Sequence, residues 1–509
     1  MRTKKIFLNM ITDIIPYILI GVIGLFKVRV IISVLGDIGN GYYQTINQII
    51  TYVFLAQIGF GDALTFYLYK HFANDDKRSI NRVYTGGRTI FKKLGLVIMS
   101  LTFLLSLILY LFYNFEGTYR FEVILTYLII SLSYLISYFG VGQTAQSIFT
   151  ADQSKYIYSL IFNITKLLCD IFLIIAVKKT QNLISISIVI LLAKTLEEII
   201  IRTILFKKYK YLKQVKNEDT KMFKMTYDIA GITINNLILN NMDAILSFIF
   251  LGPITVSIYT SYIFITRYLI EVSTKISNAV VSSFGNVLVK NETDKVYPLF
   301  MELLILFTIL SFSIIICFTL GIRSFISLWI NKENYILPYT TISLFSIITF
   351  IRIITLPLTA LINSSGKFKE SKKQLFISMI INLIISLLLV GRYKLNGLLI
   401  GTSVSYIVYL IMRINYVEKN ILIQKHKNIF INYTYIFIAF SILLFIMKYI
   451  EDLFYSSLTN IITTVLILGL LFISISFLIL GILSLKNKYA NNLIERCKKL
   501  LKRSKQEVN

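Results

Sequence analysis

Histidine, cysteine and proline are scarce in this chain. Its 509 residues include two histidines, three cysteines and five prolines. The histidines lie in predicted loops, and the cysteines (Cys169, Cys317 and Cys497) are far apart. A histidine-rich metal site and a disulfide framework both need such residues in groups. The sequence therefore predicts no metal site and no cofactor.

Charge is also scarce, because only 15% of the residues are charged while 56% are apolar and the mean hydropathy is +0.73. This composition cannot supply the polar surface of a soluble globule. The apolar runs are continuous instead of alternating, which favours membrane-spanning helices over a barrel. We expect an all-α polytopic membrane protein.

Fourteen apolar segments are long enough to cross a bilayer, which takes about 20 residues. They span roughly 6–35, 42–69, 89–113, 121–149, 156–177, 183–206, 222–250, 254–284, 297–321, 336–362, 374–390, 395–417, 428–447 and 457–484. The short loop at 391–394 makes the eleventh and twelfth segments the hardest pair to separate.

An internal repeat organises these segments. The stretch from Leu35 to Tyr43 (LGDIGNGYY) returns 216 positions later, from Leu251 to Tyr259 (LGPITVSIY), each time after the first apolar segment of a six-segment block. Many transporters are built from two such halves around a central substrate path. The predicted organisation is an N-lobe at 1–208, a connector at 209–221, a C-lobe at 222–419, two additional helices at 420–484 and a basic tail at 485–509.

Basic residues are unevenly distributed between the predicted loops. If the N-terminus is cytoplasmic, that side receives 37 of the 52 Lys and Arg residues and the opposite side receives eight. By the positive-inside rule, both termini are cytoplasmic. The same dispersal explains the net charge of +26 without a nucleic-acid partner. The tail suits either an amphipathic helix on anionic lipids or a solvated tail.

Motifs for catalysis are not found. The glycine-rich stretch from Gly36 to Gly41 is not followed by the Lys-Ser/Thr pair of a phosphate loop. We therefore expect a protein that is not an enzyme, and we expect that this chain does not itself use ATP to drive transport.

Charged residues inside the segments are the main candidates for function, because each costs about 2.5–3.5 kcal/mol near the membrane midplane. Lys166 with Asp170, and Lys194 with Glu197 and Glu198, have the spacing of ion pairs along one helix. These pairs serve either packing or transport. Lys27 lies in register with Asp243 of the second repeat, so it is either that carboxylate's partner or a contact for an anion.

Other polar residues share helical faces. Arg267, Glu271 and Lys275 fall on one face of the eighth segment. Asn236, Asn240 and Asp243 fall on one face of the seventh.

Several stretches resemble Wzx-type polysaccharide flippases of the MATE-like multidrug/oligosaccharidyl-lipid/polysaccharide (MOP) superfamily. They are Leu35 to Tyr43, QIGFGDAL at 57–64, NSSGKFK at 363–369 and NGLLIGT at 396–402, and together the resemblance covers about residues 1–420. It implies a two-lobed bundle in a bacterial cytoplasmic membrane that moves an undecaprenyl-pyrophosphate-linked oligosaccharide outward by ion-coupled alternating access. It also implies polymerase and chain-length proteins of the same pathway as partners.

We expect the substrate-contacting residues in the cavity that this family implies. Candidates for the pyrophosphate are Lys27, Arg267, Lys275 and Arg352; for the sugars, Asn236, Asn240, Gln44, Asn47 and Gln48; for ion coupling, Asp62, Asp243 and Glu271. Acids nearly match bases in this set, so a strongly cationic lumen does not follow. The alternatives left open are a lipid II flippase, a drug or cation antiporter, and a membrane glycan polymerase or acyltransferase.

Overall fold

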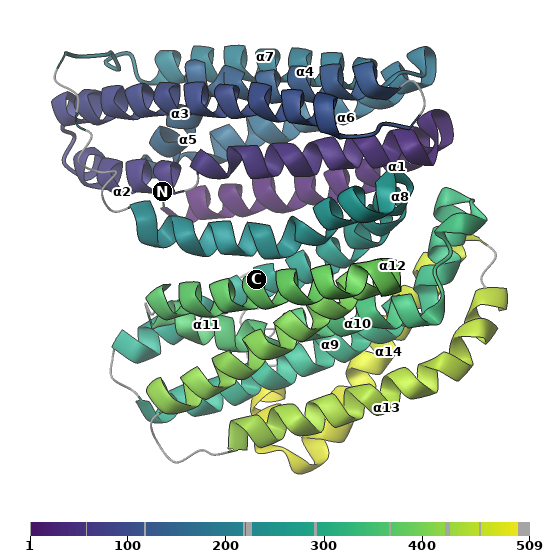
Figure 1. The fold of residues 1–509 in the computed structure, drawn as a ribbon. Coiled ribbons are helices and arrows are strands. Elements are labelled where there is room, and N and C mark those ends of the chain that lie inside the picture. Colours follow the sequence, from purple (N-terminus) through teal and green to yellow (C-terminus); the bar gives the residue numbers. More distant parts are fainter. Residues whose placement is uncertain are drawn as a thin grey trace. The chain divides into compact units, whose positions relative to one another are not determined.

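The protein is described by a computed structural model that covers residues 2–57, 59–116, 119–216, 219, 226–289, 293–365, 368–422, 428–457 and 460–496. The elements, shown in Figure 1, are α1 (Arg2–Val53), η1 (Phe54–Gln57), α2 (Phe60–Ala73), α3 (Lys77–Phe112), α4 (Tyr119–Phe139), α5 (Gly142–Ala151), α6 (Lys155–Thr180), α7 (Leu183–Lys208), α8 (Thr226–Val289), α9 (Thr293–Ile330), η3 (Glu333–Tyr335), α10 (Tyr339–Ile354), α11 (Leu356–Ser364), α12 (Phe368–Asn420), α13 (Asn428–Ser457) and α14 (Ile461–Lys486). No strand occurs among these residues.

The predicted fold class is confirmed as an all-α polytopic membrane protein. Ten helical stretches of the described chain are long and apolar enough to cross a membrane. Three of the long helices, α1, α8 and α12, contain an internal break and so hold two predicted segments each. With these breaks counted, the helices follow the order of the fourteen apolar segments.

The repeated motif forms the same backbone break in both halves. Gly36 interrupts α1 with φ 71° and ψ −178°, and Gly252 interrupts α8 with φ 82° and ψ 175°. Only glycine adopts such positive φ values at little cost. The repeated Leu-Gly pair therefore marks the same kind of backbone break in each half. The third break, at Lys394 with φ 49°, lies in the predicted 391–394 loop of α12.

Some predicted segments are divided further. The stretch 42–69 continues α1 and then passes through η1 into α2, and Gly59 before α2 has φ 88°. The stretch 121–149 divides into α4 and α5, and the stretch 336–362 into α10 and α11. Apolar continuity predicted one helix in each case, because hydropathy does not report backbone breaks.

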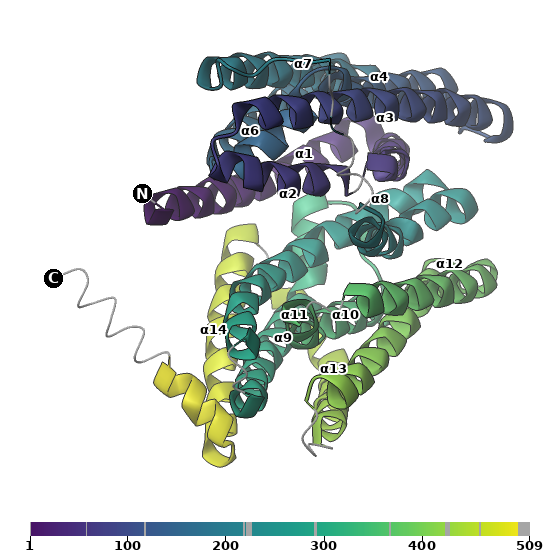
Figure 2. The ribbon, with the colours of Figure 1, turned by 90° about the vertical axis from the view of Figure 1, so that its left-hand side faces the viewer.

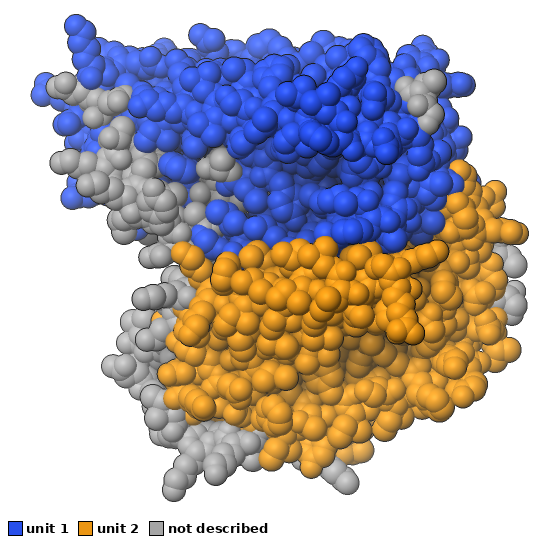
Figure 3. Space-filling view, in the orientation of Figure 1, with its two compact units in different colours: residues 1–261 blue, residues 262–509 orange. Residues whose placement is uncertain are grey.

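The helices pack into two compact units, residues 1–261 and residues 262–509, coloured separately in Figure 3. In the first unit, α6 lies against α1 and α7, while α4 lies against α7 and α3 (Figure 1). In the second, α9 contacts α10, α13 and α14, and α10 contacts α12 (Figure 2). The lobe boundaries predicted from the repeat follow a different criterion and stay a prediction.

The two repeated motifs contact each other within the first unit. The Nδ2 atom of Asn40 donates to the Oγ atom of Ser257 at 2.6 Å. A Cβ atom on Gly41 would overlap the backbone carbonyl of Pro253. The backbones of the two repeated stretches are therefore in direct contact at this point.

The predicted two additional helices, α13 and α14, pack against α9 and α10. The rings of Phe350 on α10 and Phe440 on α13 stack with centroids 3.8 Å apart. At another point Arg323 of α9 pairs with Asp452 of α13 at 2.7 Å. These two helices are thus an integral part of the second unit.

Part of the tail folds back onto α9. Residues 488–496 are helical, Ala490 is buried beside Ile305 and Ile309, and Arg496 pairs with Glu302 at 2.9 Å. This part of the tail is neither fully solvated nor free to lay its apolar side on lipid. Residues 497–509 lie outside the described chain.

We expect Gly41→Ala to destabilise the protein by about 1–3 kcal/mol, because the added methyl group meets backbone that cannot rotate away. Thermal unfolding of the purified protein in detergent measures the effect. Gly391→Ala is the control, since a Cβ atom there meets nothing within 4 Å. Equal midpoints for the two variants would contradict the contact between the repeats.

Candidate functional site

An ionic cluster, in which Lys27 and Asp170 are largely buried and Lys166 is 41% exposed, connects α1 to α6. The ammonium group of Lys27 lies 2.8 Å from Oδ1 of Asp170, and that of Lys166 lies 3.4 Å from the same oxygen. The Asp170 side chain is 2% exposed and that of Lys27 is 14% exposed. Lys166 and Asp170 share a face of α6 because they are four residues apart, and the packing of α6 against α1 brings in Lys27.

The cluster carries more positive than negative charge. Two ammonium groups share one carboxylate, and Oδ2 of Asp170 has no hydrogen-bond partner among the described residues. A charge taken out of water without full compensation is costly within a membrane. The cluster is therefore suited to attract a further anion, provided that one can reach it.

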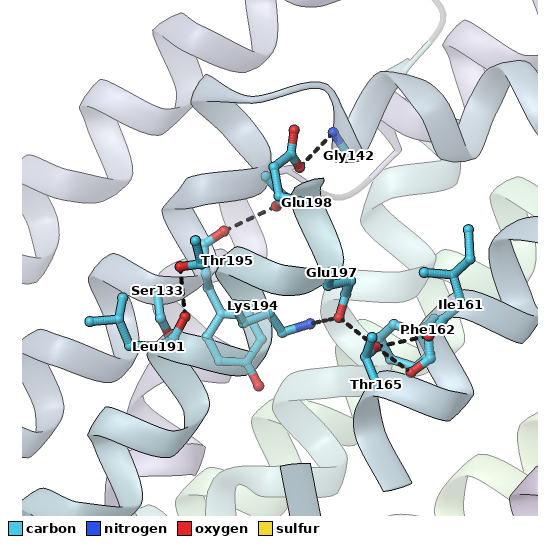
Figure 4. Close-up of polar contacts among 12 residues, drawn as sticks. Ser133, Gly142, Ile161, Phe162, Thr165, Leu191, Lys194, Thr195, Glu197 and Glu198 are labelled. Atoms are coloured by element: carbon cyan, nitrogen blue, oxygen red, sulfur yellow. Dashed lines mark hydrogen bonds and ion pairs between the residues drawn. The ribbon is translucent and has the colours of Figure 1, made fainter. Parts of the chain in front are cut away.

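A second ion pair lies on α7 and is joined to α6 by a hydrogen bond. Lys194 contacts Oε2 of Glu197 at 2.9 Å, and Oγ1 of Thr165 on α6 lies 3.3 Å from the same oxygen (Figure 4). The Lys194 ammonium also lies 5.3 Å from the ring centre of Tyr134 and 5.1 Å from that of Phe162. Here the charges match one to one and rings cover the cation. This pair has the form expected for helix packing.

Glu198 points away from that pair, as Figure 4 shows. Its carboxylate accepts hydrogen bonds from the backbone N–H groups of Val141 and Gly142, where α5 begins. A carboxylate at this position satisfies N–H groups that have no partner within the helix. The predicted pairing of Lys194 with Glu198 is wrong, because Glu198 accepts from the start of α5 while Lys194 pairs with Glu197.

Amide side chains line α1 after its break. Gln44 donates to Oδ1 of Asn40 at 3.4 Å, and Asn47 donates to the backbone carbonyl of Tyr43 at 2.9 Å. Gln44, Asn47 and Gln48 are each half-buried. The three predicted sugar contacts on α1 therefore lie on consecutive turns of one helix.

The other candidates of the first unit differ in exposure. Asp62 on α2 and Asn236 on α8 are exposed, Asn240 is half-buried, and Asp243 is buried. Asp243 accepts a long hydrogen bond, 3.5 Å, from the hydroxyl group of Tyr259. The predicted face of Asn236, Asn240 and Asp243 thus runs from exposed to buried along α8.

The remaining candidates belong to the second unit. Arg267 is exposed on α8, and Glu271 and Lys275 are half-buried there. Arg352 on α10 is half-buried, and its guanidinium carbon lies 5.4 Å from the ring centre of Tyr406. Such a distance is within the range of a cation–π interaction.

The predicted partnership of Lys27 with Asp243 is wrong. Lys27 pairs with Asp170 on α6. The repeat register relates positions in the two halves, but packing between neighbouring helices of one half decides which groups meet. The spacing of Lys166 and Asp170 was visible in the sequence, whereas no sequence signal showed that a third charge from α1 joins them.

A buried arginine in the second unit was also missed as a cavity candidate. Arg413 of α12 is 1% exposed, donates to Oγ of Ser371 at 2.7 Å and stacks on the ring of Tyr409 at 4.5 Å. Arg413 lies near the end of the predicted segment 395–417, and α12 continues past it to Asn420.

The second unit also contains an apolar cavity of about 570 Å³ between α8, α9 and α14. Its lining residues include Leu269, Ile276, Phe318, Phe325 and Phe472. A cavity with this lining suits a hydrocarbon chain.

No protein-family model and no curated protein sequence matches the chain. Solved structures do. One described as "Lipid II flippase MurJ, inward closed conformation" aligns over 93% of this chain and 98% of its own length, with a TM-score of 0.70 and 15% identity. An inward-facing multidrug resistance MATE family transporter of the MOP superfamily aligns over 78% and 95%, with a TM-score of 0.63 and 13% identity.

A third structure, a MOP superfamily transporter from Pyrococcus furiosus, aligns over 81% of this chain and 92% of its own, with a TM-score of 0.57 and 14% identity. These likenesses establish the fold class: the chain has the fold of MOP superfamily transporters, as seen in MATE and MurJ structures. They do not extend to a substrate.

We expect Asp170→Asn to destabilise the protein more than Lys27→Met. The first change leaves two ammonium groups without their shared counter-charge, a loss of the kind that costs about 3–5 kcal/mol. The second leaves Asp170 still paired with Lys166. Thermal unfolding in detergent compares the two.

The charge swap Lys27→Asp with Asp170→Lys is the matched control for pairing. It should recover part of the loss of each single change, whereas Lys27→Asp with Asp243→Lys should recover none. The opposite result would mean that Asp243 is the partner of Lys27.

Proposed function

We propose that this protein is a flippase for a polyprenyl-pyrophosphate-linked oligosaccharide, which it moves from the inner to the outer leaflet of a bacterial cytoplasmic membrane. Undecaprenyl pyrophosphate is the carrier that the resemblance to Wzx-type proteins implies. The observation that carries the proposal is the Lys27, Asp170 and Lys166 cluster, in which a membrane-embedded site holds excess positive charge. A pyrophosphate is the part of such a substrate that needs fixed cations.

Three further features support the proposal. The fold is that of MOP transporters, whose solved structures include inward-facing and outward-facing conformations. The amides on successive turns of α1 offer donors and acceptors for sugar hydroxyls. The apolar cavity between α8, α9 and α14 offers a place for part of the lipid tail.

In this proposal Arg267, Lys275 and Arg352 complete the pyrophosphate contacts begun by Lys27, and Asn236 and Asn240 add to the sugar contacts of α1. Asp62, Asp243 and Glu271 are the proposed carriers of a coupling ion, because a carboxylate in a membrane protein can change its charge during a cycle. The polymerase and chain-length proteins of the same pathway are the proposed protein partners.

Lipid II flipping is the second candidate. The MurJ structure aligns over more of this chain than the MATE structures do, and lipid II also joins a polyprenyl pyrophosphate to sugars. Both candidates use the same charge chemistry, so the glycan that accumulates when the gene is deleted separates them.

Neutralising two cations of α8 tests the substrate class. We expect Arg267→Gln with Lys275→Gln to leave the protein abundant in the membrane but to lower surface glycan at least tenfold, while lipid-linked precursor accumulates inside. Arg267→Lys should be milder, because lysine keeps the charge but loses the planar fork. Extraction of lipid-linked precursors and labelling of surface glycan measure both effects.

The control is Lys178→Gln with Lys179→Gln, which removes equal charge at the end of α6. Normal surface glycan in the well-expressed α8 variant would remove Arg267 and Lys275 from the substrate path. Normal glycan in a complete deletion, with new sensitivity to cationic drugs, would favour the antiporter.

The proposed orientation predicts a pattern of cysteine reactivity. In a cysteine-free background, Thr180→Cys and Glu333→Cys should react with a membrane-impermeant thiol reagent added outside intact cells. Asp76→Cys and Lys213→Cys should react only after the membrane is opened. The reverse pattern would invert the topology inferred from the basic residues.

A further inference from the structure

The chain after α7 is fastened along the start of α3. Asn81 of α3 makes two hydrogen bonds with it: Nδ2 donates to the carbonyl of Tyr211 at 3.0 Å, and Oδ1 accepts from the N–H of Lys213 at 3.1 Å. One turn later, Oγ1 of Thr85 accepts from the N–H of Val215 at 3.0 Å. We call residues 209–216 the strap.

Both ends of this contact are reinforced. At the start of the strap, the hydroxyl of Tyr209 donates to Oδ2 of Asp152 at 2.8 Å, and the preceding Lys208 donates to the same oxygen at 2.7 Å. Burial disfavours the charged form of Asp152, but these hydrogen bonds outweigh it and hold the pKa of the carboxyl below its usual value. Beyond the strap, a Cβ atom on Gly86 would overlap the carbonyl of Asp219. Side chain and backbone together therefore fix the course of the strap.

Burial along the strap repeats every three residues. Tyr209 and Leu212 are buried and Val215 is half-buried. Lys210, Lys213 and Lys216 are exposed, and none of them forms an ion pair with a described residue. A fixed backbone with this period holds three ammonium groups along one side, whereas a loose basic loop would scatter them.

Three nearby carboxylates have other partners. Asp76 caps α3 by accepting from the N–H of Ser79 at 3.1 Å, Asp75 lies 3.9 Å from Lys77, and Asp152 is held by Lys208. The three strap lysines are thus left to act on what lies outside the protein. The strap begins where α7 ends, and the sequence predicts that this helix crosses the membrane. The anions expected nearest to the strap are therefore the phosphates of lipid head groups.

We propose that the strap is a binding surface for anionic phospholipid head groups at the cytoplasmic leaflet, with Lys210, Lys213 and Lys216 as its contacts and with Asn81 and Thr85 holding the row in place. The proposal does not depend on the transported substrate. Each lysine near an anionic membrane surface contributes an energy equivalent to about a fivefold gain in affinity.

Native mass spectrometry of the full-length protein, titrated with phosphatidylglycerol or phosphatidylcholine in detergent, tests this. We expect Lys210→Gln with Lys213→Gln and Lys216→Gln to weaken phosphatidylglycerol binding by roughly a hundredfold, following the per-lysine factor, and to leave phosphatidylcholine binding unchanged. The control, Lys178→Gln with Lys179→Gln and Lys448→Gln, removes equal charge from three other exposed lysines and should keep wild-type affinity. Equal losses in both triple variants would mean that net charge acts and the strap does not.

A second variant tests the fastening. Asn81→Ala with Thr85→Ala keeps every lysine but frees the strap, so we expect faster trypsin cleavage at 210–216 and an affinity several-fold below that of the wild type. Full affinity with rapid cleavage would overturn the fixed row. Competition with inorganic pyrophosphate tests whether the three lysines bind a lipid phosphate or a free phosphate. If pyrophosphate displaces the lipid at equal concentration, the lysines bind free phosphate and the proposed lipid-binding surface is wrong.

Discussion

The backbone contact between the two repeated motifs is the constraint on which the first unit depends. Gly36 and Gly252 turn the chain with the same left-handed φ, and Gly41 lets the second motif approach at Pro253. Because Gly41 has no side chain, the backbones of the two motifs approach closely, and Asn40 lies within hydrogen-bond distance of Ser257. The position of α1 beyond the break then sets where its amide side chains lie.

The same helix places Lys27 against α6, and there the balance of charge becomes unequal. Lys194 and Glu197 compensate each other, and Glu198 is compensated by backbone donors of α5. Asp170 instead serves two lysines. These three polar groupings thus offset the cost of buried charge in three ways, and among them only the one that α1 joins leaves a positive excess.

Local features of the fold could be predicted from the sequence. Hydropathy located the spanning segments, and the repeated Leu-Gly located the breaks of α1 and α8. The pair Lys166 and Asp170 followed from spacing along one helix. The divisions at η1 and between α4 and α5 could not be predicted, because an apolar run reads the same whether its helix is continuous or broken. Contacts between helices could not be predicted either. The repeat register gave Lys27 the wrong partner, and no sequence pattern indicated that Glu198 binds the start of α5.

Fold and charge carry separate information about this chain. A likeness at 13–15% identity to structures described as a lipid II flippase and a multidrug resistance transporter shows that one architecture serves proteins with different substrates. A third structure of this fold is described as having a binding pocket of reverse polarity. The substrate must therefore be argued from side chains that the fold does not dictate. In this protein those are the two lysines on Asp170, and the proposal of an anionic head group as substrate rests on their charge.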